Sequence, residues 1–530
     1  DYTKHKREGI IVDVIERANE TIVGTYDRQQ NFGFVVPDDE RIGTDVFVDL
    51  KNTLDARSGA KVLVKITKWP EGDKKPEGII TEILGYKGDV GLDINCIMAN
   101  YDLPFSFPED VVKASQHINT TITDNPKRWD LRDVPMVTID GEDAKDLDDA
   151  VSGRKLDNGN YELGVHIADV SHYVVSQKAI DREAYKRGTS VYLVDRVIPM
   201  LPKVLSNGIC SLNAGEDRYA MTCMMEIDTH GKVVNYRIQP SIIHVNRRCS
   251  YKEIYKALTE DIIPDDLVPL MPMIHNLSDI AKTLNDMRRR RGALDFDFPE
   301  YKVLLDTDGT PLRIVRRDRT LAERLIEECM LIANETVATH LKNTNRTSVY
   351  RIHETPSEEK MSMYQKVLNY LGQDIRLHLD ELEPRVFQHI LDAVKGTDVE
   401  QVAQIMTLRS MQQAKYSIDN VGHFGLASKC YTHFTSPIRR YPDLMVHRLL
   451  KADMGWPDGY ANRDTKTEFL ERAAVHSSER EQVAVAAERD TVDLKKTQYM
   501  VPFIGEVFEG KISSITSFGM FVELDNGIDG

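Results

Sequence analysis

An acidic stretch bracketed by apolar residues reads Thr138-Ile139-Asp140-Gly141-Glu142-Asp143-Ala144-Lys145-Asp146-Leu147-Asp148-Asp149-Ala150-Val151. Six of the ten residues from Asp140 to Asp149 carry carboxylates, which repel one another strongly at reduced dielectric unless a cation lies between them. Apolar residues such as Ile139 and Leu147 indicate that the backbone enters and leaves a hydrophobic core here. Mg²⁺ prefers oxygen ligands and uses a few carboxylates together with water and substrate phosphate. The stretch therefore predicts a Mg²⁺-dependent phosphodiester site, with an acidic surface loop as the alternative.

The length and composition are those of a globular protein with several domains. The chain has 530 residues, which predicts about three or four domains, and its 41% hydrophobic and 29% charged content is typical of a soluble protein. It contains no apolar run of about 18 residues, so we expect no membrane span. The six cysteines are widely spaced and form no C-x-x-C pair. This spacing argues against a zinc site or a disulfide framework and indicates a reducing, cytoplasmic location.

The net charge gives an ambiguous signal about nucleic acid. A formal charge of −16 argues against a partner whose binding depends on neutralised phosphates. The basic residues are clustered, however, at positions 288–291 and again at 313–319. Nucleic-acid binding therefore stays open.

Residues 1–86 predict a small β-barrel. Short apolar or alternating segments at 9–15, 21–26, 32–37, 45–48, 61–66 and 78–83 are separated by Gly, Asn and Asp. The Phe32-Gly33-Phe34 segment, followed by residues 45–48, resembles the cold-shock version of the OB-fold, in which exposed aromatic rings stack on single-stranded bases. Phe32 and Phe34 are therefore candidate RNA contacts, and packing inside the barrel is the alternative.

Residues 87–500 predict a connector followed by a mixed α and β domain. Four prolines keep residues 87–136 mostly irregular, with one expected helix at 109–117. Strand patterns fill the first half of the domain, including 220–227 and 233–245. Helical patterns fill the second half, at 320–341, 358–371, 401–410, 443–454 and 467–498. His166, Asp169 and His172 follow a predicted strand, where hydrogen-bonded structural roles are more common than catalytic ones.

Residues 501–530 return to a β pattern that resembles the opening strands of an S1-type OB-fold. The sequence stops inside this pattern, and it begins without an initiator Met or a signal segment. We therefore expect a piece of a longer protein, with a further module possible before residue 1. Two barrels of nucleic-acid-binding type on either side of an acidic domain favour the metal-site interpretation of residues 138–151.

Four segments together resemble the RNase II/RNase R (RNB) exoribonuclease family: residues 138–150, 166–171, 198–202 and 431–443. They follow the family's order, and the Gly141-Glu142-Asp143-Ala144 form is more similar to RNase R than to RNase II. The resemblance implies an α+β multidomain fold. Its parts are an OB-fold cold-shock barrel at 1–86, a mixed α/β RNB catalytic domain at 87–500 and the start of an S1 barrel at 501–530.

The resemblance also implies an activity. We expect a monomeric, processive 3′-to-5′ hydrolase that releases nucleoside 5′-monophosphates from single-stranded RNA and from structured RNA with a 3′ overhang. In-line attack of water on phosphorus would use one or two Mg²⁺ ions. The alternatives are an RNase II-type enzyme limited to unstructured RNA, a non-catalytic RNA-binding protein, and an endonuclease with the same cations.

The resemblance assigns the metal site to four aspartates, Asp140, Asp146, Asp148 and Asp149. Of these, Asp140, Asp146 and Asp149 are the expected ligands, and Asp148 is the first residue to mutate. Arg439 matches the arginine that holds the scissile phosphate. Glu142 and Asp143 match no ligand position and are expected to shape the loop. Glu488 matches a family glutamate near the site.

The remaining matches concern RNA contacts. Tyr192 matches a tyrosine that stacks on the 3′-terminal base, and Phe296 matches an aromatic that closes the stack several bases upstream. Each such contact is worth about 1–3 kcal/mol, and core packing is the alternative for both. Tyr251 and Glu328 match positions that read ribose 2′-hydroxyl groups, with Glu327 as a competitor for Glu328.

Overall fold

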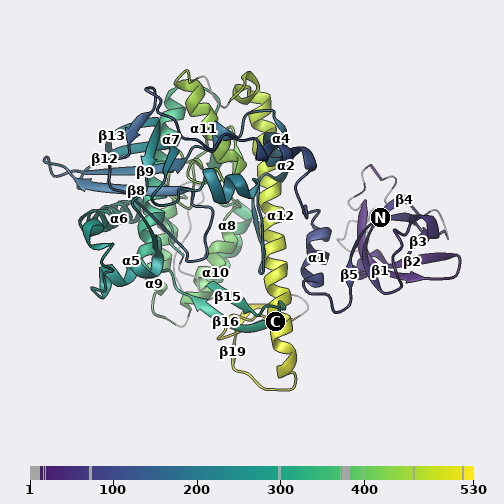
Figure 1. Ribbon diagram of the computed structural model, residues 1–530. Helices are drawn as coiled ribbons and strands as arrows, with labels where there is room; N and C mark the ends of the chain where they lie inside the picture. The colour runs from purple at the N-terminus through teal and green to yellow at the C-terminus, as the bar shows by residue number, and fades with distance from the viewer. Residues whose placement is uncertain are drawn as a thin grey trace.

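The computed structural model describes residues 20–70, 74–296, 300–370, 382–397, 399–456, 460–515 and 519–530, together with Val12, Val14, Ile15, Arg17 and Gly372. The predicted strand at 9–15 lies largely outside these residues. A small barrel and a large domain lie side by side, joined through helix α1 (Leu92–Asn100) (Figure 1). Within the described residues, no helix is both long and apolar enough to cross a membrane.

The N-terminal body is a closed five-stranded barrel, which confirms the predicted OB-type fold. Its strands follow the order β1-β2-β3-β5-β4, and the parallel pairing of β3 with β5 closes it. Buried side chains such as Tyr26, Val35 and Val62 fill the interior. The elements are β1 (Thr21–Arg28), β2 (Phe32–Pro37), η1 (Glu40–Ile42), β3 (Val46–Asp49), η2 (Leu50–Asn52), β4 (Ala60–Lys68) and β5 (Glu77–Tyr86).

A seven-stranded sheet in the order β14-β7-β8-β9-β12-β13-β6 forms the centre of the large domain. Neighbouring strands are antiparallel except at the two edges, where β14 and β6 pair in parallel. The acidic stretch connects two inner strands, because β7 ends at Asp140 and β8 begins at Asp149. The strands are β6 (Trp129–Leu131), β7 (Val137–Asp140), β8 (Asp149–Lys155), β9 (Tyr161–Ala168), β12 (Asp217–Ile227), β13 (Val233–His244) and β14 (Arg247–Ser250).

Helices α6 and α7 pack on this sheet over β8, β9 and β13. The contact is close at Gly153 of β8, where an added Cβ would lie 2.8 Å from the Leu277 side chain. Predicted and observed helix bounds agree within a few residues. The helices are α2 (Glu109–Gln116), α3 (Val170–Tyr173), α4 (Ala179–Arg187), η3 (Val204–Ile209), α5 (Tyr251–Thr259), η4 (Val268–Leu270), α6 (Met271–Arg291), α7 (Leu321–Asn343), α8 (Glu358–Tyr370), α9 (Pro384–Val394), α10 (Glu400–Ser410), α11 (Tyr441–Asp453), η6 (Asn462–Thr465), α12 (Thr467–Met500) and η7 (Val501–Phe503).

Helix α12 runs along the large domain on the side that faces the barrel (Figure 1). It contacts α1, α4, α11 and several short strands, so it links the barrel connector to the large domain. The short strands are β10 (Val191–Tyr192), β11 (Val197–Ile198), β15 (Glu300–Leu305), β16 (Pro311–Arg317), β17 (Tyr350–Ile352), β18 (Lys415–Ser417), β19 (Gly510–Ile515) and β20 (Met520–Leu524).

Two predictions about local structure are wrong. The connector contains a second helix, α1 (Leu92–Asn100), because Ile94 and Met98 lie one turn apart and are buried together against the domain. The region after residue 251 is not wholly helical, because β15 and β16 form a hairpin between α6 and α7.

Candidate active site

The β7–β8 connection is anchored to the core rather than left in solvent. Leu147 is 1% exposed. Its amide donates a hydrogen bond to the Ser211 hydroxyl (3.1 Å), and its carbonyl accepts one from the amide of Leu212 (3.0 Å). Glu142 and Asp143 are exposed. The loop therefore directs some acidic side chains inward and leaves Glu142 and Asp143 outside.

The predicted site aspartates Asp140, Asp148 and Asp149 have raised pKa values. Burial, followed by repulsion from Asp149, raises the pKa of Asp140 to about 8. Burial also raises the pKa of Asp149 to about 6, although Arg439 acts in the opposite direction. The pKa of Asp148 lies well above its usual range because its carboxyl group is buried. Clustered carboxyls with raised pKa values are typical of functional sites.

The donor set fits a hard divalent cation. Asp140 and Asp148 each have a buried Oδ2 without a hydrogen-bond partner, which is costly unless another ligand satisfies it. Across the described part of the chain, no group of three His, Cys, Asp or Glu side chains is arranged to hold a metal ion. Mg²⁺ uses only one or two protein carboxylates when water and substrate phosphate fill its other positions. The unpartnered carboxylate oxygens of Asp140 and Asp148 are ligands of this kind.

Arg439 lies beside the buried carboxylate of Asp148. Its Nε is 3.8 Å from Asp148 Oδ2, and its Nη2 donates to the Ser436 hydroxyl (3.1 Å). The amide of Ile438 donates to Asp148 Oδ1 at 2.9 Å, so the segment before α11 holds this aspartate directly. The Arg439 side chain is 43% exposed. The guanidinium can therefore counter the charge of the loop and still reach a bound anion.

Tyr192 is attached to the same loop. Its phenol donates a hydrogen bond to Asp146 Oδ2 (3.0 Å), and burial raises the pKa of Tyr192. The neighbouring strand segment is fixed to Arg439, whose carbonyl accepts a hydrogen bond from the Ser190 amide (2.9 Å). The structure thus brings Tyr192, the aspartate loop and Arg439 together from segments far apart in the sequence.

Tyr251 lies on the other side of the loop. It is the first residue of α5, and Ser250 before it pairs with Asp140 in the parallel β14–β7 register. The charge of Asp140 is, after burial, the main cause of the raised pKa of Tyr251. The structure therefore places a phenol next to Asp140.

Glu328 does not suit the predicted contact with a ribose hydroxyl. Its side chain is 3% exposed and forms a two-point ion pair with Arg288, at 2.7 and 2.9 Å. Asn285 donates a further hydrogen bond to Glu328 Oε1 at 2.8 Å. The competitor Glu327 pairs with Arg319 and is 40% exposed. Glu328 is thus fully engaged between α6 and α7, and its geometry indicates a structural role.

Phe296 and Glu488 lie in other surroundings. Phe296 packs against an apolar cluster that includes Tyr364 and Phe387 of α8 and α9. This is the core-packing alternative for Phe296. Glu488 lies on α12 with a largely exposed side chain, and partial desolvation, followed by the charge of Glu300, raises its pKa. The RNA-binding roles of Phe296 and Glu488 therefore stay predictions.

Phe32 and Phe34 form an aromatic surface on the barrel. Their rings lie 5.4 Å apart in an edge-on arrangement, and Phe47 adds a third ring 5.7 Å from Phe32. All three are partly exposed and lie outside the barrel core. Lys75 lies 4.4 Å above the Phe34 ring. Aromatic rings with a neighbouring cation are typical of single-stranded nucleic-acid surfaces.

Arg440 was not among the predicted site residues. This partly buried side chain pairs with Asp443 at 2.7 Å, and its charge opposes the rise in the pKa of Asp149. The only sequence signal was its position directly after Arg439, since its influence on Asp149 depends on the tertiary fold. Two adjacent arginines thus oppose the charge of the aspartate loop.

His166 and Asp169 have structural environments, as expected. His166 is buried between the hydroxyls of Ser152 (3.0 Å) and Thr222 (2.9 Å), and burial lowers its pKa to about 3. Asp169 is paired with Arg128 (2.8 Å) and Lys451 (2.7 Å) in the interior. These residues support the sheet beneath the loop.

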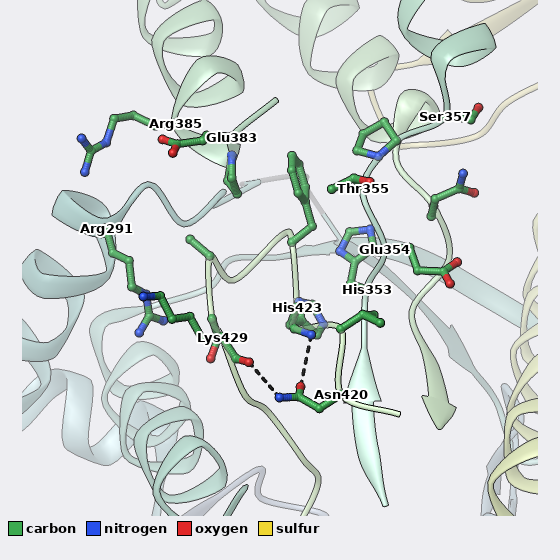
Figure 2. Close-up of a pocket in the computed structure, with 18 of the residues that line it drawn as sticks. Arg291, His353, Glu354, Thr355, Ser357, Glu383, Arg385, Asn420, His423 and Lys429 are labelled. Carbon is green, nitrogen blue, oxygen red and sulfur yellow. Dashed lines mark hydrogen bonds between the residues drawn. The ribbon is translucent and has the colours of Figure 1, made fainter. Parts of the chain in front are cut away.

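A separate cavity of about 1220 Å³ lies away from the aspartates, near β17 and the start of α9 (Figure 2). His353, Glu354 and His423 line it, and Asn420 donates a hydrogen bond to the carbonyl of Lys429 there (3.0 Å). No residue of the β7–β8 loop contributes to its lining. It is therefore not the predicted site.

Comparison with known families and proteins agrees with this geometry. The RNB domain family matches residues 128–454, the cold shock domain family 34–108 and the S1 RNA binding domain family 501–530. Ribonuclease R of Thermotoga maritima is 45% identical over 525 residues, which cover 97% of this chain and 74% of that protein. Ribonuclease R 1 of Lactococcus lactis is 42% identical over 537 residues, covering 99% of this chain and 66% of that protein.

Two solved structures of Mycoplasma genitalium RNase R are also similar. The complex with ribose methylated single-stranded RNA has a TM-score of 0.92 at 30% identity and covers 98% of this chain and 82% of that chain. The complex with double-stranded RNA has a TM-score of 0.93 at 29% identity and covers 98% and 93%. These matches put the chain in the class of hydrolytic exoribonucleases. It belongs to the RNB family, and its relatives there are ribonuclease R proteins. The predicted family and order of modules are confirmed.

Proposed function

We propose that this chain shortens RNA processively from the 3′ end and releases nucleoside 5′-monophosphates at the β7–β8 loop. The observation that carries the proposal is that Asp148 and Arg439 lie next to each other, with 3.8 Å between Asp148 Oδ2 and Arg439 Nε. A buried acidic cluster opposed by an accessible arginine suits a phosphodiester, which needs both metal ligands and a partner for phosphate charge.

The aspartates would hold Mg²⁺, as one ion or two, with Asp140 and Asp148 offering unpartnered buried oxygens. The metal would supply activation of the attacking water and stabilisation of the leaving 3′-oxygen. Arg439 is oriented by Ser436 and presents its exposed guanidinium to the scissile phosphate. Its charge stabilises the negative charge that develops there.

Two phenols would position the end of the RNA. Tyr192 is fixed by its hydrogen bond to Asp146, so a base stacked on its ring is held at a constant distance from the loop. Stacking accepts any base, which suits digestion without sequence preference. Tyr251, next to Asp140, is placed to contact a ribose 2′-hydroxyl, the group that distinguishes RNA from DNA.

The proposed substrates are single-stranded RNA and structured RNA with a single-stranded 3′ overhang. The likeness to ribonuclease R proteins and the double-stranded RNA complex of one relative support this choice over an enzyme limited to unstructured RNA. The six cysteines are unpaired, which fits our proposal of a monomer in the reducing cytoplasm.

The test uses uniformly labelled RNA, with Mg²⁺, in three forms: linear, circular, and duplex with a 3′ overhang. We expect labelled mononucleotides from the linear and overhang forms, without a ladder of intermediate lengths, and intact circles. Cleavage of circles would identify an endonuclease. Arrest at the duplex would identify an enzyme limited to unstructured RNA. Products that are unchanged by EDTA would contradict the metal site.

A further inference from the structure

The β15–β16 hairpin lies outside the set of active-site residues, and its two faces carry different kinds of side chains. Cross-strand pairs set its faces: Lys302 lies opposite Val315, Leu304 opposite Arg313, and Glu300 opposite Arg317. Because side chains alternate along a strand, these six residues share one face. That face carries three cations, Lys302, Arg313 and Arg317, and one carboxylate.

The opposite face is used for packing. Val303 is 4% exposed, and the phenol of Tyr301 donates a hydrogen bond to the carbonyl of Asp525 (3.3 Å). Both strands contact α12, beside which Figure 1 shows the hairpin. The face with Tyr301 and Val303 is therefore packed against the rest of the protein, while Lys302, Arg313 and Arg317 are exposed.

The cationic face reaches the active-site loop. Lys302 Nζ lies 3.7 Å from Asp143, the exposed carboxylate of the β7–β8 connection. Asp143 follows Asp140 by three residues, so β15 lies next to the loop that carries the aspartates.

The tip of the hairpin borders the barrel. A cavity of about 1020 Å³ is lined by Gly309 and Thr310 of the turn, by Lys61 of the barrel and by Lys495 of α12. Arg313 and Arg317 are separated by four residues of extended chain, about 13 Å. The cationic face therefore spans the distance between the barrel and the aspartate loop.

We propose that Lys302, Arg313 and Arg317 form a phosphate-binding ledge that holds the RNA backbone on its way to the aspartates. The proposal rests on the proposed exoribonuclease function and adds a binding site upstream of the reacting phosphate. Contacts between arginine and phosphate are independent of sequence and depend strongly on salt. The ledge thus positions RNA and takes no part in bond cleavage.

The test measures binding of a long single-stranded RNA without divalent cation, as a function of salt concentration. Each lost phosphate contact reduces the slope of log affinity against log salt by about 0.7. We expect the double variant R313Q/R317Q to have a slope about 1.4 shallower than that of the unmodified protein. Between roughly 50 and 200 mM salt, the fold-loss of affinity should therefore be about seven times smaller for the variant than for the unmodified protein. The double variant R313K/R317K should restore the slope.

Arg316 supplies the matched control. It lies between the two arginines in sequence but points to the opposite face of the strand, where its side chain is 63% exposed and pairs with Asp318 at 2.8 Å. R316Q should keep the original slope. In cleavage assays with Mg²⁺, R313Q/R317Q should raise KM for long RNA much more than it lowers kcat, since the ledge acts on binding.

Lys302→Gln gives an independent measurement from the other strand and should make the slope about 0.7 shallower. If R313Q/R317Q and K302Q both bind RNA with the slope and KM of R316Q, while the unmodified protein still shortens linear RNA, the ledge is refuted and the proposed function stands. If the unmodified protein does not shorten linear RNA, the proposed function itself fails.

Discussion

The effect of Glu328 on protein stability distinguishes a structural role of this residue from a contact with a ribose hydroxyl. Glu328→Gln keeps the shape of the side chain but removes the charge opposite Arg288, whose side chain is 6% exposed. Removing one partner of a buried ion pair costs about 3–5 kcal/mol, because the other charge remains buried. Glu327 and Asp295 also act on Arg288, so we expect the lower end of this range, about 3 kcal/mol.

The measurement is the free energy of unfolding in urea, and Glu327→Gln is the matched control. Glu327 is adjacent in sequence but pairs with Arg319 at a half-exposed position, where loss of an ion pair costs about 1 kcal/mol or less. If Glu328 has a structural role, Glu328→Gln should lower the free energy of unfolding much more than Glu327→Gln does. The preference for RNA over DNA should change little. Equal stability of the two variants, with a lost RNA preference only in Glu328→Gln, would refute the reasoning and restore the ribose contact.

Three further predictions concern the stacking surfaces and the core. Tyr192→Ala should weaken binding of a 3′ RNA end by about 1–3 kcal/mol, whereas Tyr192→Phe should lose about 1 kcal/mol or less; equal losses by fluorescence anisotropy would contradict stacking. Phe34→Ala should weaken binding of long single-stranded RNA by about 1–3 kcal/mol in the same assay, and an unchanged affinity would show that the barrel rings do not contact it. His166 has a pKa lowered to about 3 from 6.5, so the unfolded chain takes up its proton first and stability falls as pH drops below about 6.5. His166→Gln should reduce the stability loss between pH 6.5 and about 5 by about 1.5 kcal/mol in urea titrations, and an equal loss in both proteins would contradict the buried neutral state.

Local patterns predicted the barrel and the helices α2, α7, α8, α10, α11 and α12, because alternation and helical spacing are properties of short segments. The order of the modules was also predicted correctly. The β15–β16 hairpin was missed because its charged residues interrupt the alternation within a region of helical character. Helix α1 was missed because the prolines of the connector favour irregular structure.

The site shows where local patterns stop being informative. The sequence identified the acidic loop and Arg439, but it could not show that Ile438 and Arg439 contact Asp148 across the fold. Glu328 lies at a helical position that resembles a binding residue, and its ion pair with Arg288 joins residues 40 positions apart. Such pairings depend on how α6 packs against α7 and have no local signature.

RNA cleavage by the Asp148→Asn variant is the most direct test of the central claim, which is that the reaction takes place at the aspartate loop. Asp148 is 4% exposed and accepts a hydrogen bond from Ile438, so Asn keeps the packing and removes the charge available to a cation. With uniformly labelled linear RNA and Mg²⁺, we predict that the variant binds RNA as the unmodified protein does and releases no mononucleotides. Cleavage by Asp148→Asn at a rate near that of the unmodified protein would contradict a reaction centred on the aspartate loop.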